Sequence, residues 1–180
     1  MSDIKYKEKL SGIRAFAMDV DGVLTDGGVF ATPDGDLLRT FDSKDGFGLR
    51  MCKIKGYPVG IITGGSSESV TKRALGLGID EFNIYLHARD KVPSFIKFLE
   101  DNNLKAEEVA YAGDDIPDIG ILSRCGLAFC PSDAVPEVKA VCDYVSIHKG
   151  GHGCVREMIE QVMKAKGEWN FDPELHSQWF

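Results

Sequence analysis

Short apolar runs alternate with amphipathic segments along most of the chain. The runs have the length of β-strands and are rich in Val, Ile, Ala and aromatic residues; they cover residues 13–20, 57–62, 81–86, 108–112, 126–130 and 144–147. The segments between them have helical length and cover residues 46–55, 67–77, 91–102, 116–124, 135–141 and 155–166. Strands that alternate with helices build parallel sheets, because each crossover must lie on a face of the sheet. The pattern predicts an α/β fold, with a Rossmann-like parallel sheet and helices on both faces.

One segment departs from the alternation. Residues 28–32 and 37–41 are strand-like and flank an Asp-Gly turn sequence, which predicts a β-hairpin flap after the first strand. The length of 180 residues fits one domain, which we expect at residues 1–166. Residues 167–180 form a polar tail with four aromatic side chains. Because large aromatic side chains are costly to leave in water, we expect the tail to pack at an interface between subunits. The alternative is a tail that folds onto its own subunit or stays disordered.

The composition limits the partners of the chain. Asp and Glu number 28 against 21 Lys and Arg, which gives a net charge of −7. There is no basic run, so no nucleic-acid partner is expected, whereas a small anion fits if a few cations converge. Five cysteines without a C-x-x-C pair and no apolar leader segment predict a cytoplasmic protein. The apolar runs are too short to span a membrane, so no membrane partner is expected.

The strongest chemical motif follows the first apolar run. It reads Asp19-Val20-Asp21-Gly22, and ligands of open α/β sheets bind at the carboxyl ends of the strands. Two carboxylates at such an edge can act on one centre, one as nucleophile and the other in proton transfer. A calcium loop is the alternative, but it needs an oxygen ligand at the fifth position and a Glu at the twelfth, where this chain has Val and Phe.

A second acidic motif follows the run at 108–112. It contains Asp114, Asp115 and Asp118, and three carboxylates this close repel one another unless a cation neutralises them. Near Asp19 and Asp21 they would provide the oxygen ligands of a hard divalent ion, which favours Mg²⁺ as the cofactor. The alternative is helix capping, which accounts for one of the three acids.

Two weaker signals complete the set. Thr63 ends the second core strand and precedes Gly64, Gly65 and a helix, where a hydroxyl and backbone N–H groups suit a phosphoryl group. Lys91 begins a helix, where its charge opposes the helix dipole and therefore hints at a functional role. Taken singly, each signal has an ordinary structural explanation, as a strand-to-helix turn or a surface cation.

In this order, the four signals resemble the haloacid dehalogenase superfamily of phosphohydrolases. The resemblance implies that Asp19 is the nucleophile and that Asp21 is the general acid and base. It implies that Mg²⁺ is held by Asp19, the Asp21 backbone carbonyl and Asp114. The residues implied to support this centre or to bind the phosphoryl group are Thr63, Lys91, Asp115 and Asp118.

Three segments narrow the resemblance. Residues 19–27, 44–50 and 150–157 are similar to the family of 3-deoxy-D-manno-octulosonate 8-phosphate phosphatases. That family lacks a cap domain. This chain agrees, because only the hairpin separates the first motif from the next helix. The family implies a homotetramer whose sites are completed by a neighbouring subunit, acting in lipopolysaccharide precursor synthesis on a small anionic sugar phosphate. The substrate contacts that it implies are Asp21, Asp42, Lys44, Asp45, Gly46, Arg50, Gly65, Arg73 and Lys91.

Two departures leave the exact sugar open. Many relatives carry Arg where this chain has Gly65 and His152. Each departure removes a cation that could meet the carboxylate of the sugar. A phosphatase for nine-carbon acids of the sialic type is therefore the nearest alternative, and a non-catalytic binding domain on the same fold is a second one.

Overall fold

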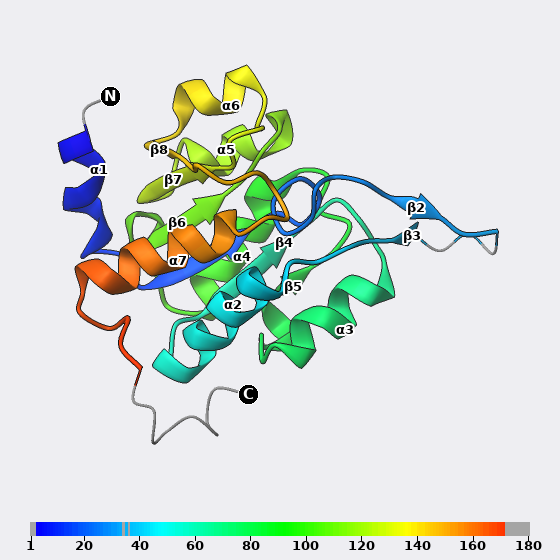
Figure 1. Ribbon diagram of the computed structural model, residues 1–180, viewed down its shortest axis with the longest axis horizontal. Helices are drawn as coiled ribbons and strands as arrows, with labels where there is room; N and C mark the ends of the chain where they lie inside the picture. The colour runs from blue at the N-terminus through cyan, green and yellow to red at the C-terminus, as the bar shows by residue number, and fades with distance from the viewer. Residues whose placement is uncertain (1–2, 34, 36, 172–180) are drawn as a thin grey trace.

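Six parallel strands form the central sheet in the computed structural model, which describes residues 3–33, 35 and 37–171 (Figure 1). The strand order is β5-β4-β1-β6-β7-β8. The strands are β1 (Ala15–Met18), β4 (Val59–Ile62), β5 (Ile84–Tyr85), β6 (Val109–Ala112), β7 (Leu127–Cys130) and β8 (Tyr144–Val145). The chain leaves β1 toward β4 on one side and reaches β6 on the other. Such a reversal of strand order opens a crevice at the carboxyl ends of the strands.

Helices cover both faces of the sheet. One face carries α1 (Asp3–Leu10), α2 (Ser43–Lys55), α3 (Glu68–Gly76) and α7 (Cys154–Ala165). The other carries α4 (Lys91–Asp101), α5 (Ile119–Leu122) and α6 (Pro136–Val141). Three single-turn 3₁₀ helices lie at Glu81–Asn83, Ala106–Glu108 and Ile116–Asp118. The predicted α/β architecture is confirmed.

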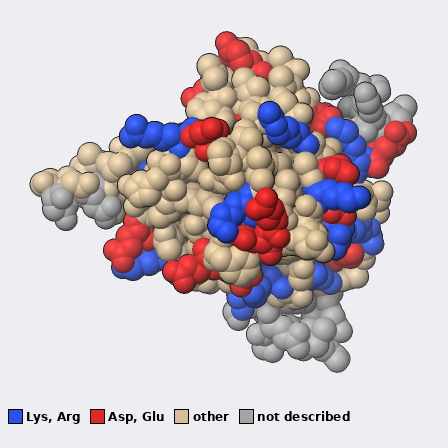
Figure 2. Space-filling model, turned by 180° about the vertical axis from the view of Figure 1, so that it is seen from behind, with Lys and Arg blue, Asp and Glu red and all other residues tan. Residues whose placement is uncertain are grey.

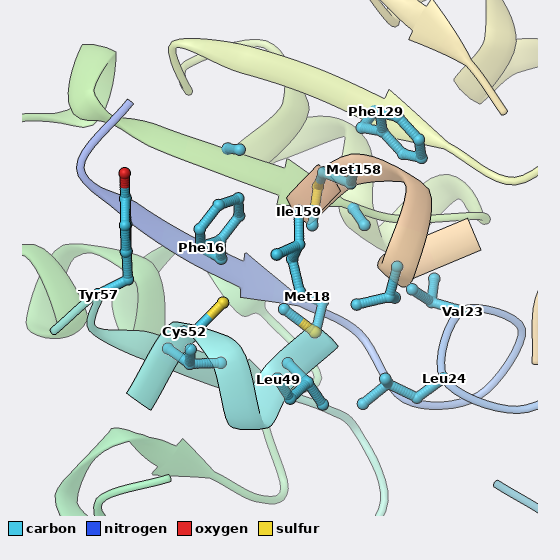
Figure 3. Close-up of a cluster of buried hydrophobic side chains, with 14 of the residues drawn as sticks. Phe16, Met18, Val23, Leu24, Leu49, Cys52, Tyr57, Phe129, Met158 and Ile159 are labelled. Atoms are coloured by element: carbon cyan, nitrogen blue, oxygen red, sulfur yellow. The ribbon is translucent and has the colours of Figure 1, made fainter. Parts of the chain in front are cut away.

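The side chains of β1 alternate between two hydrophobic cores. Phe16 and Met18 pack with Leu49 and Cys52 of α2 and with Ile159 of α7 (Figure 3). Ala15 and Ala17, which alternate with them along the strand, face the second core, beneath α4 and α5. All four β1 residues are buried, so the strand reads as a continuous apolar run, as strands covered on both faces do.

The predicted hairpin is present and extends away from the sheet (Figure 1). Its strands are β2 (Phe30–Ala31) and β3 (Leu37–Leu38), and Phe30 pairs with Leu38 in antiparallel register. Both side chains are exposed, at 69% and 44% of their surface. The paired strands therefore leave these side chains outside the core of their own subunit, whereas Phe41, after β3, packs against that core.

The boundaries of several elements differ from the prediction. The run at 81–86 is strand only at its end, because its first three residues form a 3₁₀ turn. The helix expected from residue 46 begins at Ser43, since Asp42 caps it by accepting hydrogen bonds from two backbone N–H groups. The helix expected at 116–124 is a 3₁₀ turn followed by α5. The first helix, α1, was not predicted: its apolar periodicity is weak, and it is stabilised by packing on the sheet.

The tail begins by packing on its own subunit. Trp169 meets the Phe47 ring of α2 edge-on and Phe171 meets it at a tilt, with ring centroids 6.4 and 6.0 Å away. The guanidinium carbon of Arg156 lies 5.0 Å from the Phe47 ring and 4.6 Å from the Trp169 ring. The two remaining tail aromatics, Trp179 and Phe180, lie outside the described residues. The boundary at residue 166 and the role of the tail stay predictions.

The surface shows no concentration of one charge on the face opposite Figure 1. There, Lys and Arg are interspersed with Asp and Glu (Figure 2). Across the described ranges, no helix combines the length and apolarity that crossing a bilayer requires.

Candidate active site

A cleft of about 420 Å³ opens at the carboxyl ends of β1, β4 and β6. Because these strands are parallel neighbours, the residues that follow them meet at one edge of the sheet. The site residues that the sequence placed on separate motifs and that the structure brings together here are Asp19, Asp21, Thr63, Gly65, Lys91, Asp114, Asp115 and Asp118. The cleft therefore gathers every residue predicted to take part in catalysis or metal binding.

Asp19 lies at the floor of the cleft and is 8% exposed. One carboxylate oxygen accepts a hydrogen bond from the backbone N–H of Val20 at 2.6 Å, and the other lies 2.6 Å from the Nζ of Lys91. Burial raises the pKa of Asp19 to about 6, against the opposing effect of the Lys91 charge. The carboxylate is thus held in one orientation by a backbone N–H group and the Lys91 ammonium.

Lys91 bridges Asp19 and Asp118. Its Nζ lies 2.7 Å from Asp118 Oδ1, and the side chain is almost fully buried. Burial works against its charged form, but the two carboxylates outweigh burial and raise the pKa of Lys91. The lysine therefore stays charged at the start of α4, where the helix dipole alone would disfavour it.

Asp118 uses both of its carboxylate oxygens within the protein. Oδ1 also accepts from the hydroxyl of Tyr111 at 2.6 Å, and Oδ2 accepts from the backbone N–H groups of Asp114 and Asp115 at 3.1 and 3.3 Å. Asp115 in turn caps the following 3₁₀ turn by accepting from the N–H of Ile116. Asp115 and Asp118 together form a capping box at this turn, so helix capping accounts for two of the three acids and leaves Asp114.

Asp114 differs from the other two acids in the hydrogen bonding of its carboxylate. Its Oδ1 is buried and has no hydrogen-bond partner among the described residues. Burial, with the neighbouring Asp19 and Asp118, raises its pKa to about 7. Carboxylate oxygens of these three acids lie within 4.8 Å of one another. A buried, unpartnered oxygen beside other carboxylates fits a hard divalent cation.

Gly22 makes this approach of Asp114 possible. A Cβ at this position would lie 2.0 Å from Asp114 Oδ2, and the backbone has a φ of 85°. Any other residue would have to displace the acid and would adopt a conformation that side chains disfavour. Gly22 of the first motif therefore leaves the space that the Asp114 carboxylate of the second motif occupies.

The Asp21 side chain lies outside the cluster of Asp19, Asp114 and Asp118 and pairs with an arginine. Its two oxygens accept from Nε and Nη2 of Arg39 at 2.5 and 2.9 Å, and the Arg39 side chain is 3% exposed. Arg89 also lines the cleft. The sequence motifs did not single out either arginine. The available signals were that Arg39 lies in the hairpin segment and that Arg89 stands two positions before Lys91. Thr63, 2% exposed, accepts a hydrogen bond on its hydroxyl from the N–H of Gly65.

A model of the haloacid dehalogenase-like hydrolases matches residues 80–158. The 3-deoxy-D-manno-octulosonate 8-phosphate phosphatase of Escherichia coli K12 is 36% identical over 160 residues, which cover 89% of this chain and 84% of that protein. The chain belongs to the family of 3-deoxy-D-manno-octulosonate 8-phosphate phosphatases. The resemblance that the motifs indicated is confirmed.

Solved structures of this octulosonate phosphatase family share the fold along nearly the whole chain. The Moraxella catarrhalis phosphatase, solved with a magnesium ion, a phosphate ion and a KDO molecule, has a TM-score of 0.89 and 34% identity, covering 98% of this chain and 99% of that one. The cobalt-bound enzyme of Haemophilus influenzae has a TM-score of 0.86 and 32% identity, covering 92% and 96% of the two chains.

The remaining contacts implied by the octulosonate phosphatase family do not line this cleft. Asp42 caps α2. The guanidinium of Arg73 lies against Gly46, where a Cβ would come within 2.5 Å of Arg73 Nη2. Asp45 is 1% exposed and accepts from the backbone N–H groups that begin α7.

Two further residues of this group also lie around α2. Lys44 lines a second cleft, of about 360 Å³, with His148, His152 and Arg156. A Cβ on Gly78 would lie 3.2 Å from Arg50 Nη1. All six implied contacts outside the cleft therefore belong to the surroundings of α2, and their role in substrate binding stays a prediction.

Proposed function

We propose that this family member is a Mg²⁺-dependent phosphatase that hydrolyses 3-deoxy-D-manno-octulosonate 8-phosphate to the free sugar acid and phosphate, in lipopolysaccharide precursor synthesis. The observation that carries the proposal is the buried, unpartnered oxygen of Asp114 beside Asp19, at the switch point of the sheet. The names of the relatives, which match most of the chain, support the choice of substrate.

The chemistry follows from the two acids of the first motif. An oxygen of Asp19 attacks phosphorus while the bond between phosphorus and the sugar oxygen breaks, which forms an aspartyl-phosphate. Asp21 gives a proton to the departing sugar oxygen. It then takes a proton from the water that attacks the aspartyl-phosphate, which releases inorganic phosphate and restores Asp19.

Positive charge from the protein assists both steps. Lys91, 2.6 Å from Asp19, faces the oxygens of the transferring group, and the Thr63 hydroxyl binds one of them. Mg²⁺, held by Asp19, Asp114 and the Asp21 backbone carbonyl, supplies further charge neutralisation when bound. Asp118 acts through Lys91 and the loop, because hydrogen bonds already occupy both of its oxygens.

We further propose that the protein works as a cytoplasmic homotetramer. The implied substrate residues around α2 lie outside the cleft of their own subunit, which supports their acting at the site of a neighbour. The exposed apolar hairpin supports contact between copies, since exposed apolar side chains that lie together favour an interface.

Phosphate release from a substrate panel tests the function. We expect the highest kcat/KM on the eight-carbon sugar acid phosphate, loss of activity with EDTA, and recovery with Mg²⁺ but not Ca²⁺, whose longer ligand distances misplace the phosphoryl group. Asp19→Asn should be inactive, because an amide is a poor nucleophile. A higher kcat/KM on a nine-carbon sialic-type 9-phosphate would reassign the substrate. Absence of Mg²⁺-dependent release from any phosphate monoester would favour a binding domain instead.

A further inference from the structure

Arg39 reaches from the base of the hairpin into the wall of the active-site cleft. Its guanidinium donates two parallel hydrogen bonds to Asp21, at 2.5 and 2.9 Å, and its side chain is buried. A Cβ on Gly65 would lie only 3.3 Å from Arg39 Nη2. Because Gly65 has no side chain, the Arg39 guanidinium has room to lie between the hairpin and the phosphoryl site.

The guanidinium is itself fixed in place. Nη1 donates to the carbonyl oxygen of Leu37 at 2.9 Å, and the hydroxyl of Ser67 donates to the same oxygen at 3.3 Å. Ser67 immediately precedes α3, which packs on the body of the protein. A continuous series of hydrogen bonds therefore connects α3, the base of the hairpin, Arg39 and Asp21.

The geometry explains what the arginine does for the carboxylate. The Asp21 side chain is 34% exposed and does not belong to the compact acidic cluster, so without Arg39 it would rotate between several orientations. A planar guanidinium fork sets the plane of a carboxylate as well as its position. The fork occupies two of about four acceptor positions on the carboxylate and leaves the others for a proton.

We propose that Arg39 is a positioning residue for proton transfer, which holds the Asp21 carboxylate in the orientation that serves the leaving oxygen. This proposal rests on the proposed role of Asp21 as general acid. As the bond from Asp19 to phosphorus forms and the ester bond breaks, the proton passes from Asp21 to the sugar oxygen. Arg39 neither gains nor loses a proton in this step.

The dependence of the rate on the leaving group tests the proposal, because kcat/KM reports the steps up to loss of that group. p-Nitrophenolate leaves as a stable anion and needs little protonation, whereas a sugar alkoxide needs the proton. We expect Arg39→Ala to lower kcat/KM about 10- to 100-fold on the sugar phosphate, since general acid catalysis is worth about 10²–10⁴ in rate. On p-nitrophenyl phosphate we expect a loss below about threefold. Asp21→Asn should show the same selectivity.

Matched variants separate positioning from other effects. Arg14→Ala removes an exposed arginine that pairs with Glu108 and should change neither rate. Arg39→Lys keeps the charge but not the fork, so we expect the selective loss to persist. The shift in melting temperature caused by Mg²⁺ should match that of the wild type in both Arg39 variants.

Three outcomes would overturn the inference: equal losses on both substrates, unchanged rates in Arg39→Ala, or full recovery in Arg39→Lys. If the wild type is active and Asp21→Asn is selective while Arg39→Ala is not, only the inference fails. If the wild type releases no phosphate, the proposed function fails as well.

Discussion

At the scale of single residues, hydrogen bonding gives neighbouring acids different tasks. Asp118 and Asp114 stand four positions apart and both lie beside Asp19. Asp118 is completely buried yet satisfied by four donors, whereas Asp114 keeps one buried oxygen without a donor. An unsatisfied buried acid costs stability unless a ligand pairs with it. The unpaired oxygen therefore supports the proposed role of Asp114 as a ligand of the cation.

Asp114→Asn should stabilise the metal-free protein while removing its response to Mg²⁺. Burial raises the pKa of Asp114 to about 7, so its ionised form is unfavourable at pH 8, and a neutral amide removes that penalty. We expect a gain of about 1–2 kcal/mol, or about 2–8 °C in Tm, allowing for partial exposure of the site. Thermal unfolding with EDTA and with Mg²⁺ measures both effects. A lower Tm for the variant in EDTA would contradict this account.

At the scale of elements, a side chain from another helix caps the N-terminus of α7. Asp45 of α2 accepts from the backbone N–H groups of Gly153 and Arg156, at 3.2 and 2.7 Å. The residue at the cap position of α7, Gly153, has no side chain to do so. The two helices, which pack together over β1, are therefore also joined through a buried carboxylate.

Asp45→Ala should destabilise the fold more than Asp45→Asn. Alanine leaves two buried N–H groups without an acceptor, which costs about 1–3 kcal/mol. Asparagine keeps one oxygen that can accept a hydrogen bond. It also removes the buried negative charge of Asp45, a carboxyl whose pKa burial raises to about 6. Urea unfolding of both variants gives the order of stability. An Asp45→Ala protein as stable as the wild type would show that water satisfies the start of α7.

At the scale of the whole molecule, buried acids set how stability responds to pH. Asp19, Asp45 and Asp114 all have folded pKa values raised from 3.8, to about 6, 6 and 7. The folded protein therefore binds protons at pH values where the unfolded chain has already lost them. Their contribution to stability is greatest below the unfolded pKa and is lost as the pH rises through about 6 to 7.

The Tm of the metal-free protein should consequently fall between about pH 5 and about pH 8. Mg²⁺ should remove most of this fall, because it binds the ionised carboxylates of the cleft. Calorimetry at several pH values, with EDTA or with Mg²⁺, gives the two curves. A metal-free Tm that rises over this interval would mean that these acids titrate near their ordinary values.

Assembly is the second property of the whole molecule. The double variant Phe30→Ser, Leu38→Ser removes an exposed cross-strand pair of the hairpin, so we expect a smaller species by light scattering and little change in the fold of each subunit. Phe82→Ser provides the control, because Phe82 is also exposed, at 57%, and lies outside the hairpin. An unchanged tetramer in the double variant, or a wild type that is monomeric, would contradict the proposed assembly.

The sequence by itself determined the order of the elements and the edge of the sheet at which the proposed site residues gather. Asp19, Thr63 and Asp114 each come within two residues of a buried strand, and parallel neighbouring strands end at one edge, so local patterns were enough to gather them. A stripe of apolar residues likewise identified most helices without reference to the rest of the chain. Local patterns placed these motifs correctly, although the segments at 81–86 and 116–124 fold in part as 3₁₀ turns.

Only the tertiary structure decided which partner each side chain takes. The pairing of Arg39 with Asp21 spans 18 residues, and the cap that Asp45 places on α7 spans 111. The division of work between Asp114 and Asp118 depends on which donors the surrounding elements deliver. Such contacts arise when distant segments pack together, and no periodicity in the sequence records them. For the same physical reason, the sequence does not record that Asp45 of α2 caps α7 or that Arg73 of α3 lies against Gly46.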